Sequence, residues 1–228
     1  MTHEDEYHDN MVTMLELIWG EAYMAPGGSG NVAKMLKGID TRGKRILDIG
    51  CGIGGPAFEM ARTHSANVVG IDLEGPLVAR ATQAAADLGL SDKCTFQTVT
   101  AGPLPFDDES FDIVISAGAF TQIEDKAGIL GESLRVLKPG GYLSCYDWLK
   151  SDGEYSEDMH HWFKLEGLTY ELETLHGYRD QFFRMVELLG QQDADHFVEN
   201  WRALVTVIDK GEMRQGYCRG RRPELQQS

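Results

Sequence analysis

The chain has 228 residues, enough for one domain with an appendage around a sizeable buried core. Hydrophobic residues make up 42% and charged residues 25%, ordinary values for a globular protein, and the formal net charge is −15. This acidity argues against nucleic acid as a partner, because phosphate contacts need clustered Lys and Arg. No apolar run reaches the roughly 18 residues that span a membrane, and the acidic, polar start is unlike a secretory signal. We therefore expect a cytoplasmic protein without a membrane span.

Four scattered cysteines form no CxxC pair (Cys51, Cys94, Cys145 and Cys218). They predict reduced, mostly buried thiols and neither a zinc site nor a disulfide framework, so no metal is expected. The one basic cluster is residues 214–223, "RQGYCRGRRP". A solvated terminus is the preferred interpretation of this cluster, and an anion contact is the alternative.

In chain order, residues 11–19 have the apolar spacing of a helix. Glycines in residues 25–30 then interrupt the pattern, and residues 31–39 predict a second helix with Asn31 as its N-cap. Strand and helix signals alternate from there. Strands are expected at 45–50, 67–73, 94–100, 111–118 and 140–149, and helices at 55–64, 76–90 and 126–138. Continuous Val/Ile/Leu strands separated by helices predict an α/β fold with a parallel, doubly wound sheet.

The last third of the chain is harder to interpret. Residues 157–190 are expected to be mostly helical, and residues 194–213 are either a helix or, at 203–208, a strand. A sheet of this kind usually ends with two further strands, and none is convincing between Leu149 and His196. A helix-plus-strand unit near residues 177–179 is therefore either absent or replaced by a shorter variant.

The most informative segment is "LDIGCGIGG" (Leu47–Gly55), with glycines at 50, 52, 54 and 55 between a strand and a helix. Glycine there lets a ligand approach the backbone closely. Asp48 lies two residues before the first glycine, and Asp72 ends the next strand 22 residues after Gly50, where a carboxylate can accept both hydroxyls of a ribose. No Lys-Ser/Thr follows, so a triphosphate site is not expected. The structural alternative is a tight turn with Asp72 as a helix cap.

These features resemble the class I S-adenosylmethionine-dependent methyltransferases over roughly residues 30–150. The motifs "ILDIGCGIGG", "VVGIDL", "LPFDDESFDIVIS" and "LRVLKPGGYL" stand in the usual order and at the usual spacing. The resemblance implies a Rossmann-like sheet of seven strands, with S-adenosylmethionine over the carboxyl ends of the first four. It also implies a lid segment at 1–30, a cofactor-binding core at 31–150 and a substrate-side region at 151–228.

Carried over by position, the glycine loop would pass under the methionine part of the cofactor, Asp72 would bind the ribose and Thr100-Ala101 would flank the adenine. Thr100 stands where many family members have Asp, and its hydroxyl is a weaker acceptor. The cofactor-binding residues implied by the resemblance are Met24, Ala25, Asp48, Gly50, Cys51, Gly52, Gly54, Asp72, Leu73, Thr100, Ala101 and Ala117.

A narrower resemblance is to the phosphoethanolamine N-methyltransferase family. "WGEAYMAPGG" (Trp19–Gly28) resembles its lid segment, the ending "GEMRQGYCRGRRP" resembles its C-terminus, and Tyr7 matches a lid tyrosine. Tyr7 is otherwise a surface tyrosine near a frayed terminus. The family's Asp and His after strand four fall on Gly118 and Gln122, so phosphoethanolamine itself is not the expected acceptor.

The resemblance assigns catalytic roles to Tyr7 and Gln122. The family's phosphate-binding cluster falls at 148–170, where Tyr170 is the clear match. The substrate-binding residues we expect are Tyr23, Gly118, Trp148, Tyr170 and Arg202.

Methyl transfer from a sulfonium is an in-line displacement that depends on positioning. A base is needed only if the acceptor must lose a proton. Since Gly118 and Gln122 do not titrate, we expect a small polar acceptor, preferably an amine nitrogen. A thioether sulfur is one alternative, and a catalytically weak cofactor-binding protein is another. If a proton acceptor exists, the candidates are Asp147, His160, His161 and Tyr170.

Overall fold

The computed structural model describes residues 7, 9–150, 154, 156–164, 186–188 and 190–224. The chain divides into two compact units. Residues Glu21–Asp147 and Gly216–Ser228 form the larger one, called the sheet unit below. Residues Met1–Gly20 and Trp148–Gln215 form the other, called the helical unit.

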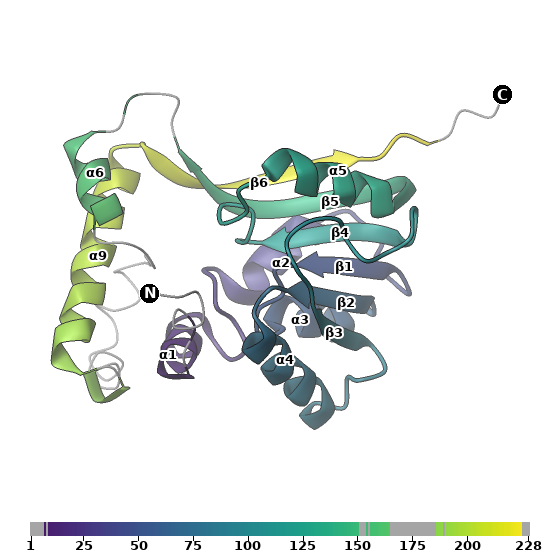
Figure 1. Cartoon of the computed structure of the whole chain (residues 1–228), viewed down its shortest axis with the longest axis horizontal. Coiled ribbons are helices and arrows are strands. Elements are labelled where there is room, and N and C mark those ends of the chain that lie inside the picture. The colour runs from purple at the N-terminus through teal and green to yellow at the C-terminus, as the bar shows by residue number, and fades with distance from the viewer. Residues whose placement is uncertain are drawn as a thin grey trace. The chain divides into compact units, whose positions relative to one another are not determined.

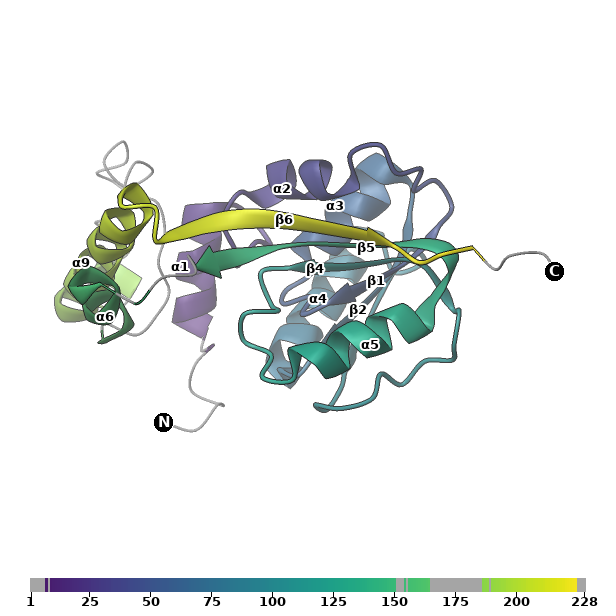
Figure 2. The ribbon, with the colours of Figure 1, turned by 90° about the horizontal axis from the view of Figure 1, so that it is seen from above.

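The described residues form a six-stranded sheet in the order β3-β2-β1-β4-β5-β6 (Figure 1). Its strands are β1 (Arg45–Ile49), β2 (Asn67–Asp72), β3 (Cys94–Thr98), β4 (Phe111–Ala117), β5 (Leu137–Lys150) and β6 (Met213–Arg221). The first five pair in parallel, and β6 lies antiparallel to β5, as Figure 2 shows. The predicted Rossmann-like α/β fold is confirmed, with six strands among the described residues where seven were expected.

Four helices of the sheet unit connect or flank these strands: α2 (Gly28–Leu36), α3 (Gly55–His64), α4 (Gly75–Asp87) and α5 (Lys126–Val136). Figure 2 shows α2 and α3 on one side of the sheet and α5 on the other. Successive strand residues alternate between two buried clusters because side chains of a strand point to opposite faces. Ile46 packs with α2 and α3, whereas its neighbour Leu47 packs with Val136 of α5. The strands are therefore apolar on both faces, as a parallel sheet requires.

The predicted N-cap of the second helix is wrong. Helix α2 begins at Gly28 after Gly27, whose φ of +84° favours glycine. Asn31 is buried within the helix, and its Nδ2 donates a hydrogen bond to the Pro26 carbonyl at 2.6 Å. Asn31 thus holds the preceding turn by its side chain from inside the helix.

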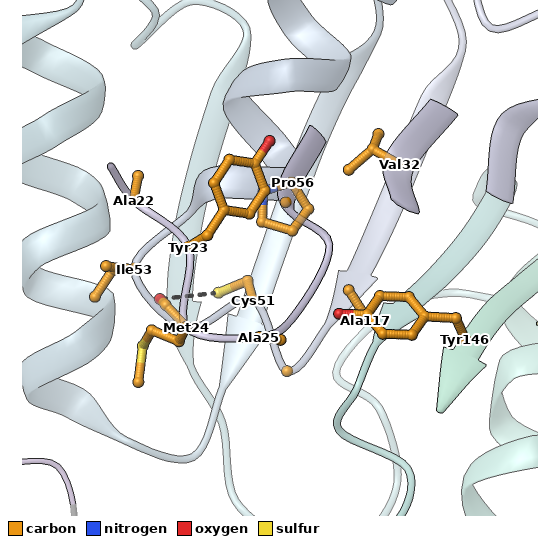
Figure 3. A pocket seen from close by; sticks show the side chains of 13 residues that line it. Ala22, Tyr23, Met24, Ala25, Val32, Cys51, Ile53, Pro56, Ala117 and Tyr146 are labelled. Carbon is orange, nitrogen blue, oxygen red and sulfur yellow. Dashed lines mark hydrogen bonds between the residues drawn. The ribbon is translucent and has the colours of Figure 1, made fainter. Parts of the chain in front are cut away.

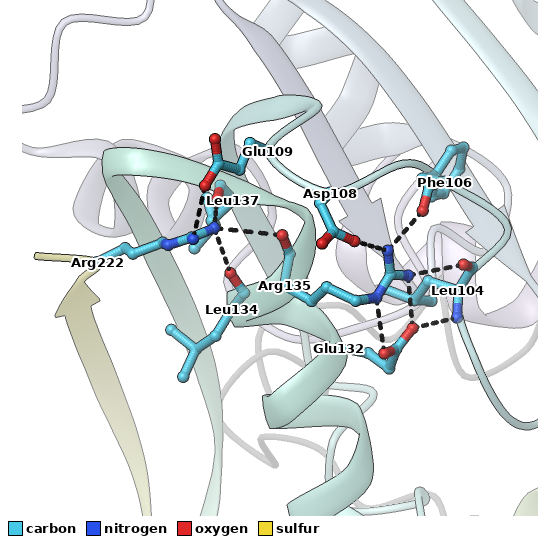
Figure 4. Close-up of polar contacts among 9 residues, drawn as sticks. All are labelled: Leu104, Phe106, Asp108, Glu109, Glu132, Leu134, Arg135, Leu137 and Arg222. Carbon is cyan, nitrogen blue, oxygen red and sulfur yellow. Dashed lines mark hydrogen bonds and ion pairs between the residues drawn. The ribbon is translucent and has the colours of Figure 1, made fainter. Parts of the chain in front are cut away.

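The basic tail is an ordered strand, because most of residues 214–223 form β6 or follow it directly, and most of these residues are exposed. Arg222 donates to the Leu137 carbonyl at the end of α5 and pairs with Glu109 at 2.8 Å (Figure 4). Arg219 donates to the Lys37 carbonyl after α2 at 2.8 Å. Carbonyls at helix C-termini lack partners within the helix, so the arginines satisfy them. This local requirement outweighs the preference of arginine for solvent.

The guanidinium of Arg135 on α5 orders the connection between β3 and β4, which contains no helix. It donates to the carbonyls of Leu104 and Phe106 at 3.0 and 2.7 Å and pairs with Asp108 and Glu132 (Figure 4). This connection leads directly into β4, whose carboxyl end borders the site described below.

The helical unit contains α1 (Asp9–Trp19), α6 (Glu157–Lys164) and α9 (Gln191–Asp209). Residues 203–208 belong to α9, which settles the choice between helix and strand. A cluster of Met159, Leu204, Val207 and Met213 joins α6 to α9. Residues 177–179, where a missing unit was suspected, lie outside the described residues. Among the described helices, none is long and apolar enough to cross a membrane.

Candidate functional site

The order of strands places a crevice at the carboxyl ends of β1 and β4. The chain runs from β1 to β2 and β3 on one side of β1, and then crosses over to β4 and β5 on the other side. Loops diverge at such a switch point, which is where open α/β sheets bind ligands. The glycine loop follows β1 at this point, and the loop containing Gly118 follows β4.

Backbone geometry explains the glycines of this loop. Gly50 and Gly52 have φ of +72° and +52°, in the left-handed region that favours glycine. The amides of Gly50 and Cys51 both donate to the Ile71 carbonyl, at 2.9 and 3.0 Å. A Cβ on Gly50 would stand 2.3 Å from Cβ of Ala119 in the loop after β4. The glycine loop is therefore held against β2 on one side and the β4 loop on the other.

Asp72 at the end of β2 supports the same loop. Its Oδ2 accepts a hydrogen bond from the Gly52 amide at 2.8 Å, and its Oδ1 accepts one from the Glu74 amide at 3.1 Å. The N-cap of α4 is Glu74. Asp72 is therefore not a helix cap, which was the alternative interpretation of this residue. Beside it Leu73 is 53% exposed, and Thr100 is exposed after β3. Ala101 is exposed as well, so these two strand ends present an open surface.

Asp48 is a buried carboxyl group in the middle of this arrangement. Its side chain is 0% exposed, and neither carboxylate oxygen has a hydrogen-bond partner among the described residues. Burial, with a further contribution from the charge of Asp72, raises its pKa to about 7. A buried carboxylate without a partner is costly unless a cation or a donor compensates it. Asp48 therefore fits a cationic ligand group.

A cavity of about 50 Å³ lies between the glycine loop and the segment from Ala22 to Gly28 (Figure 3). Its lining is Ala22, Tyr23, Met24, Ala25, Gly28, Val32, Gly50, Cys51, Gly52, Ile53, Pro56, Ala117 and Tyr146. It is smaller than the roughly 300–1,000 Å³ of small-molecule sites. It therefore accommodates a small group, and a larger ligand would extend over the exposed ends of β2 and β3.

Several residues expected at the cofactor meet at this cavity: Met24, Ala25, Gly50, Cys51, Gly52 and Ala117. Tyr23, expected at the substrate, lines it as well. Gly54 lies deeper, because a Cβ there would meet the ring of Phe58 at 2.7 Å.

Tyr146 is a lining residue that the sequence analysis missed. It stands beside Ala117 in the parallel register of β4 and β5, and its hydroxyl donates to the Pro26 carbonyl at 3.1 Å. Burial raises its pKa to about 12. Its place near the end of β5 is the sequence signal that could have identified Tyr146 as a site residue. Tyr146 lies on the same face of β5 as Ser144, whose hydroxyl donates to the Met35 carbonyl.

The ionisable side chains of the described lining are Tyr23, Cys51 and Tyr146. Burial raises the pKa of each of them, so all three are neutral at pH 7. The described lining contains no Asp, Glu, His, Lys or Arg.

The β4 loop brings no titrating group to the cavity either. Gly118 has a φ of +86° and donates its amide to the Tyr146 carbonyl at 3.0 Å. A Cβ on Gly118 would stand 3.8 Å from the Tyr146 hydroxyl, so the position borders the cavity. The Gln122 side chain is exposed. Asp147 is buried and accepts a hydrogen bond from the Thr121 amide at 2.9 Å, so it anchors this loop.

The remaining expected residues belong to the helical unit or are not described. Trp148 is partly buried against the α6–α9 cluster, Arg202 is exposed on α9, and Tyr7 is half-buried. His160 and His161 are both exposed on α6. These five do not contribute to the cavity of the sheet unit. Tyr170 lies outside the described residues.

Comparison with known proteins gives a family and several relatives. Residues 40–200 match the model of a family described as "Methyltransferase domain". Phosphoethanolamine N-methyltransferase 1 of Triticum aestivum is 28% identical over 92% of this chain and 48% of its own length. The match thus covers most of this chain but only about half the length of these curated relatives.

A sterol 24-C-methyltransferase of Aspergillus fumigatus is 40% identical, over 52% of this chain and 32% of that protein. Among solved structures, Haemonchus contortus phosphoethanolamine N-methyltransferase 2 in complex with S-adenosyl-L-methionine has a TM-score of 0.79 at 23% identity, covering 96% of this chain and 58% of that one. A putative sarcosine dimethylglycine methyltransferase from Galdieria sulphuraria has a TM-score of 0.80 at 17% identity, covering 95% and 98%.

Proposed function

This chain belongs to the family of S-adenosylmethionine-dependent methyltransferases, and we propose that it methylates a small amine whose nitrogen is already nucleophilic. A tertiary amine fits this description, because its free base attacks the methyl group without prior deprotonation on the enzyme. S-adenosylmethionine supplies the methyl group as an electrophile on its sulfonium sulfur. The protein then has to bind the donor and the acceptor, align them for the displacement and exclude water from the site.

One observation carries the proposal. The described lining of the cavity holds no side chain that can accept a proton at pH 7, because Tyr23, Cys51 and Tyr146 are all neutral. Methylation of a primary or secondary amine leaves a proton on the product nitrogen for such a group to remove, whereas methylation of a free tertiary amine leaves none. Gly118, where the phosphoethanolamine N-methyltransferase pattern has an Asp, adds no carboxylate.

The residues around the glycine loop and at the end of β2 suit the cofactor. Asp48 would hold its ammonium group, since a buried carboxylate without a partner favours a cation. Gly50 and Gly52 would let its methionine part approach the backbone. Asp72, with two carboxylate oxygens at the end of β2, would accept the ribose hydroxyls, and exposed Leu73 would offer an apolar surface to the adenine.

The relatives support an amine without identifying one. The curated matches that cover about nine-tenths of this chain are named for phosphoethanolamine, an N-acceptor, and one structural neighbour is named for N-methylated glycines. The sterol 24-C-methyltransferase match covers only 52% of this chain, so it carries less weight for the acceptor than the longer matches do.

A thioether acceptor is the second candidate, favoured by the same base-free lining. Both candidates are tested by incubating the protein with saturating S-adenosylmethionine and measuring S-adenosylhomocysteine release against pH. Two tertiary amines of different pKa and one thioether serve as acceptors. For an amine, kcat should fall below a pH that shifts with the amine's own pKa, and mass spectrometry should find the quaternary ammonium product. A thioether should give a profile without that shift.

A matched pair of variants sharpens this experiment. Gly118→Asp places a carboxylate beside the cavity, where the neighbouring atoms leave room for a Cβ. Gly118→Ala imposes the same backbone strain without the charge. The Asp variant should gain activity on secondary amines that both wild type and the Ala variant lack. Efficient methylation of phosphoethanolamine by the wild-type protein would contradict the base-free mechanism.

A further inference from the structure

Two cysteines far apart in the sequence lie opposite each other in the antiparallel pair formed by β5 and β6. Register is fixed by three neighbouring contacts. The Arg222 amide donates to the Gly141 carbonyl at 2.9 Å, the Arg221 guanidinium lies 5.6 Å from the centre of the Tyr142 ring, and the rings of Tyr146 and Tyr217 are 5.9 Å apart. In each pair the two residue numbers add up to 363. The Gly140 amide also donates to the Arg222 carbonyl at 2.9 Å, so β5 has one extra residue at Gly140 and keeps this register from Gly141 onward.

The same register places Cys145 opposite Cys218, and the side chain and backbone of Cys218 act on the Cys145 thiol from close by. Directly opposed residues of an antiparallel pair have Cα atoms about 4.5–5.5 Å apart, within the range that a disulfide spans. Cys145 is 8% exposed and Cys218 is exposed, so an oxidant in solution reaches one thiol while the other is held beside it. The remaining thiols, Cys51 and Cys94, are buried.

We propose that Cys145 and Cys218 form a redox-sensitive pair that a peroxide converts into a cross-strand disulfide. In the first step the Cys218 thiolate attacks the peroxide O–O bond and becomes a sulfenic acid, releasing hydroxide. In the second step the Cys145 thiolate attacks the Cys218 sulfur, the S–S bond forms, the S–O bond breaks and water leaves. Overall, two thiols and one hydrogen peroxide give one disulfide and two waters, and the two thiol protons end on the two oxygens that leave.

The cross-link would act one residue away from the contacts that hold the cavity's cover. Tyr217 on β6 donates to Asn31 Oδ1, Asn31 donates to the Pro26 carbonyl, and the Tyr146 hydroxyl donates to that carbonyl too. Fixing β6 to β5 would restrain Tyr217 and hence this chain of hydrogen bonds. The inference rests on strand register and exposure, and it holds independently of the acceptor.

The experiment compares the wild-type protein with Cys145→Ser, Cys218→Ser and the control Cys94→Ser, whose thiol instead contacts the Ala57 carbonyl at 3.5 Å. Each reduced protein is treated with hydrogen peroxide and then alkylated under denaturing conditions. Wild type and Cys94→Ser should each lose two alkylatable thiols together and regain them with dithiothreitol. Trypsin should release residues 136–150 linked to 215–219. The oxidised protein should also melt about 5 °C or more higher than the reduced one.

Neither Cys145→Ser nor Cys218→Ser should form the linked peptide. In Cys145→Ser, dimedone should trap the sulfenic acid on Cys218. The proposal is overturned if wild-type Cys218 is oxidised and trapped without losing the Cys145 thiol, or if its only disulfide joins two molecules. It is also overturned if both thiols remain alkylatable after peroxide treatment that oxidises free methionine in the same tube.

Discussion

Replacing Asp48 with Asn tests the least ordinary electrostatic feature of this protein. The carboxyl group lies in β1 with no exposure, and neither oxygen has a hydrogen-bond partner among the described residues. Burial and the charge of Asp72 both raise the pKa of Asp48, and no positively charged group lowers it. Without a ligand, the ionised carboxylate therefore destabilises the fold.

The magnitude follows from the pKa of Asp48, which burial and the charge of Asp72 raise from 3.8 to about 7. Each pKa unit corresponds to about 1.4 kcal/mol, so the ionised form costs on the order of 4 kcal/mol. Below the unfolded pKa the group is protonated in both states and the cost is absent. As pH rises toward 7 the unfolded chain ionises first, so stability is lost progressively, and above 7 the full cost applies.

The assay is urea unfolding of wild type and Asp48→Asn without ligand, between about pH 5 and 8. Relative to wild type, the variant should gain about 2–3 kcal/mol more at pH 8 than at pH 5. The buried amide also lacks a partner, which lowers stability by a constant amount at every pH. The change with pH is therefore the informative quantity. Saturating S-adenosylmethionine should stabilise wild type more than the variant.

Asp112→Asn is the control with the opposite sign. Burial alone would raise the pKa of Asp112, but hydrogen bonds from the Arg45 amide and from Lys138 lower it overall. Its stabilisation is present above the unfolded pKa and lost only at more acidic pH, so this variant should lose a constant amount between pH 5 and 8. A constant difference for Asp48→Asn as well would refute the assignment of a buried, ionising carboxyl.

Three further predictions concern the loops around the cavity. Asp72→Ala removes two hydrogen-bond acceptors from the loop and the site, so S-adenosylhomocysteine affinity should fall at least about tenfold by calorimetry; unchanged affinity would contradict the placement of the cofactor. Gly50→Ala should destabilise the protein by about 1–3 kcal/mol more than Gly38→Ala. Both glycines have positive φ, but only the Cβ at Gly50 would collide, with Ala119; equal losses in thermal unfolding would show that this contact does not matter. Gln122→Ala should lower kcat while leaving the KM for S-adenosylmethionine unchanged, and equal turnover in both proteins would remove Gln122 from the mechanism.

The fold was predictable where local signals are strong. Continuous apolar strands and the glycine loop identify the parallel sheet, because each of its strands must be apolar on both faces. The predictions were wrong where the partner of a hydrogen bond could not be identified from the neighbouring sequence. Arg222 looked like part of a solvated tail because nothing nearby in the sequence reveals the α5 carbonyls that it caps. Asn31 looked like an N-cap because its true partner, the Pro26 carbonyl, belongs to a turn whose path the sequence does not specify.

The site was predictable in its cofactor half for the same reason. Gly50, Gly52 and Asp72 act through backbone conformation and short-range hydrogen bonds, which leave a fixed spacing in the sequence. Tyr146 and the pairing of Cys145 with Cys218 depend on which strands become neighbours, and β6 begins more than 60 residues after the end of β5. Such contacts leave no periodic signal in a single sequence.

The charges around the cavity bear on how the reaction would be promoted. The charge of Asp72 acts on Asp48, whereas the described lining of the cavity itself is neutral at pH 7. Carboxylates here would attract a cationic donor but would also stabilise its sulfonium charge, which is lost on transfer. An amine acceptor acquires that positive charge as the sulfonium loses it, so the total charge within reach of the carboxylates stays constant through the displacement. A tertiary amine or a thioether would therefore use the acidic surroundings in both reactant and product, which an acceptor that ends neutral would not.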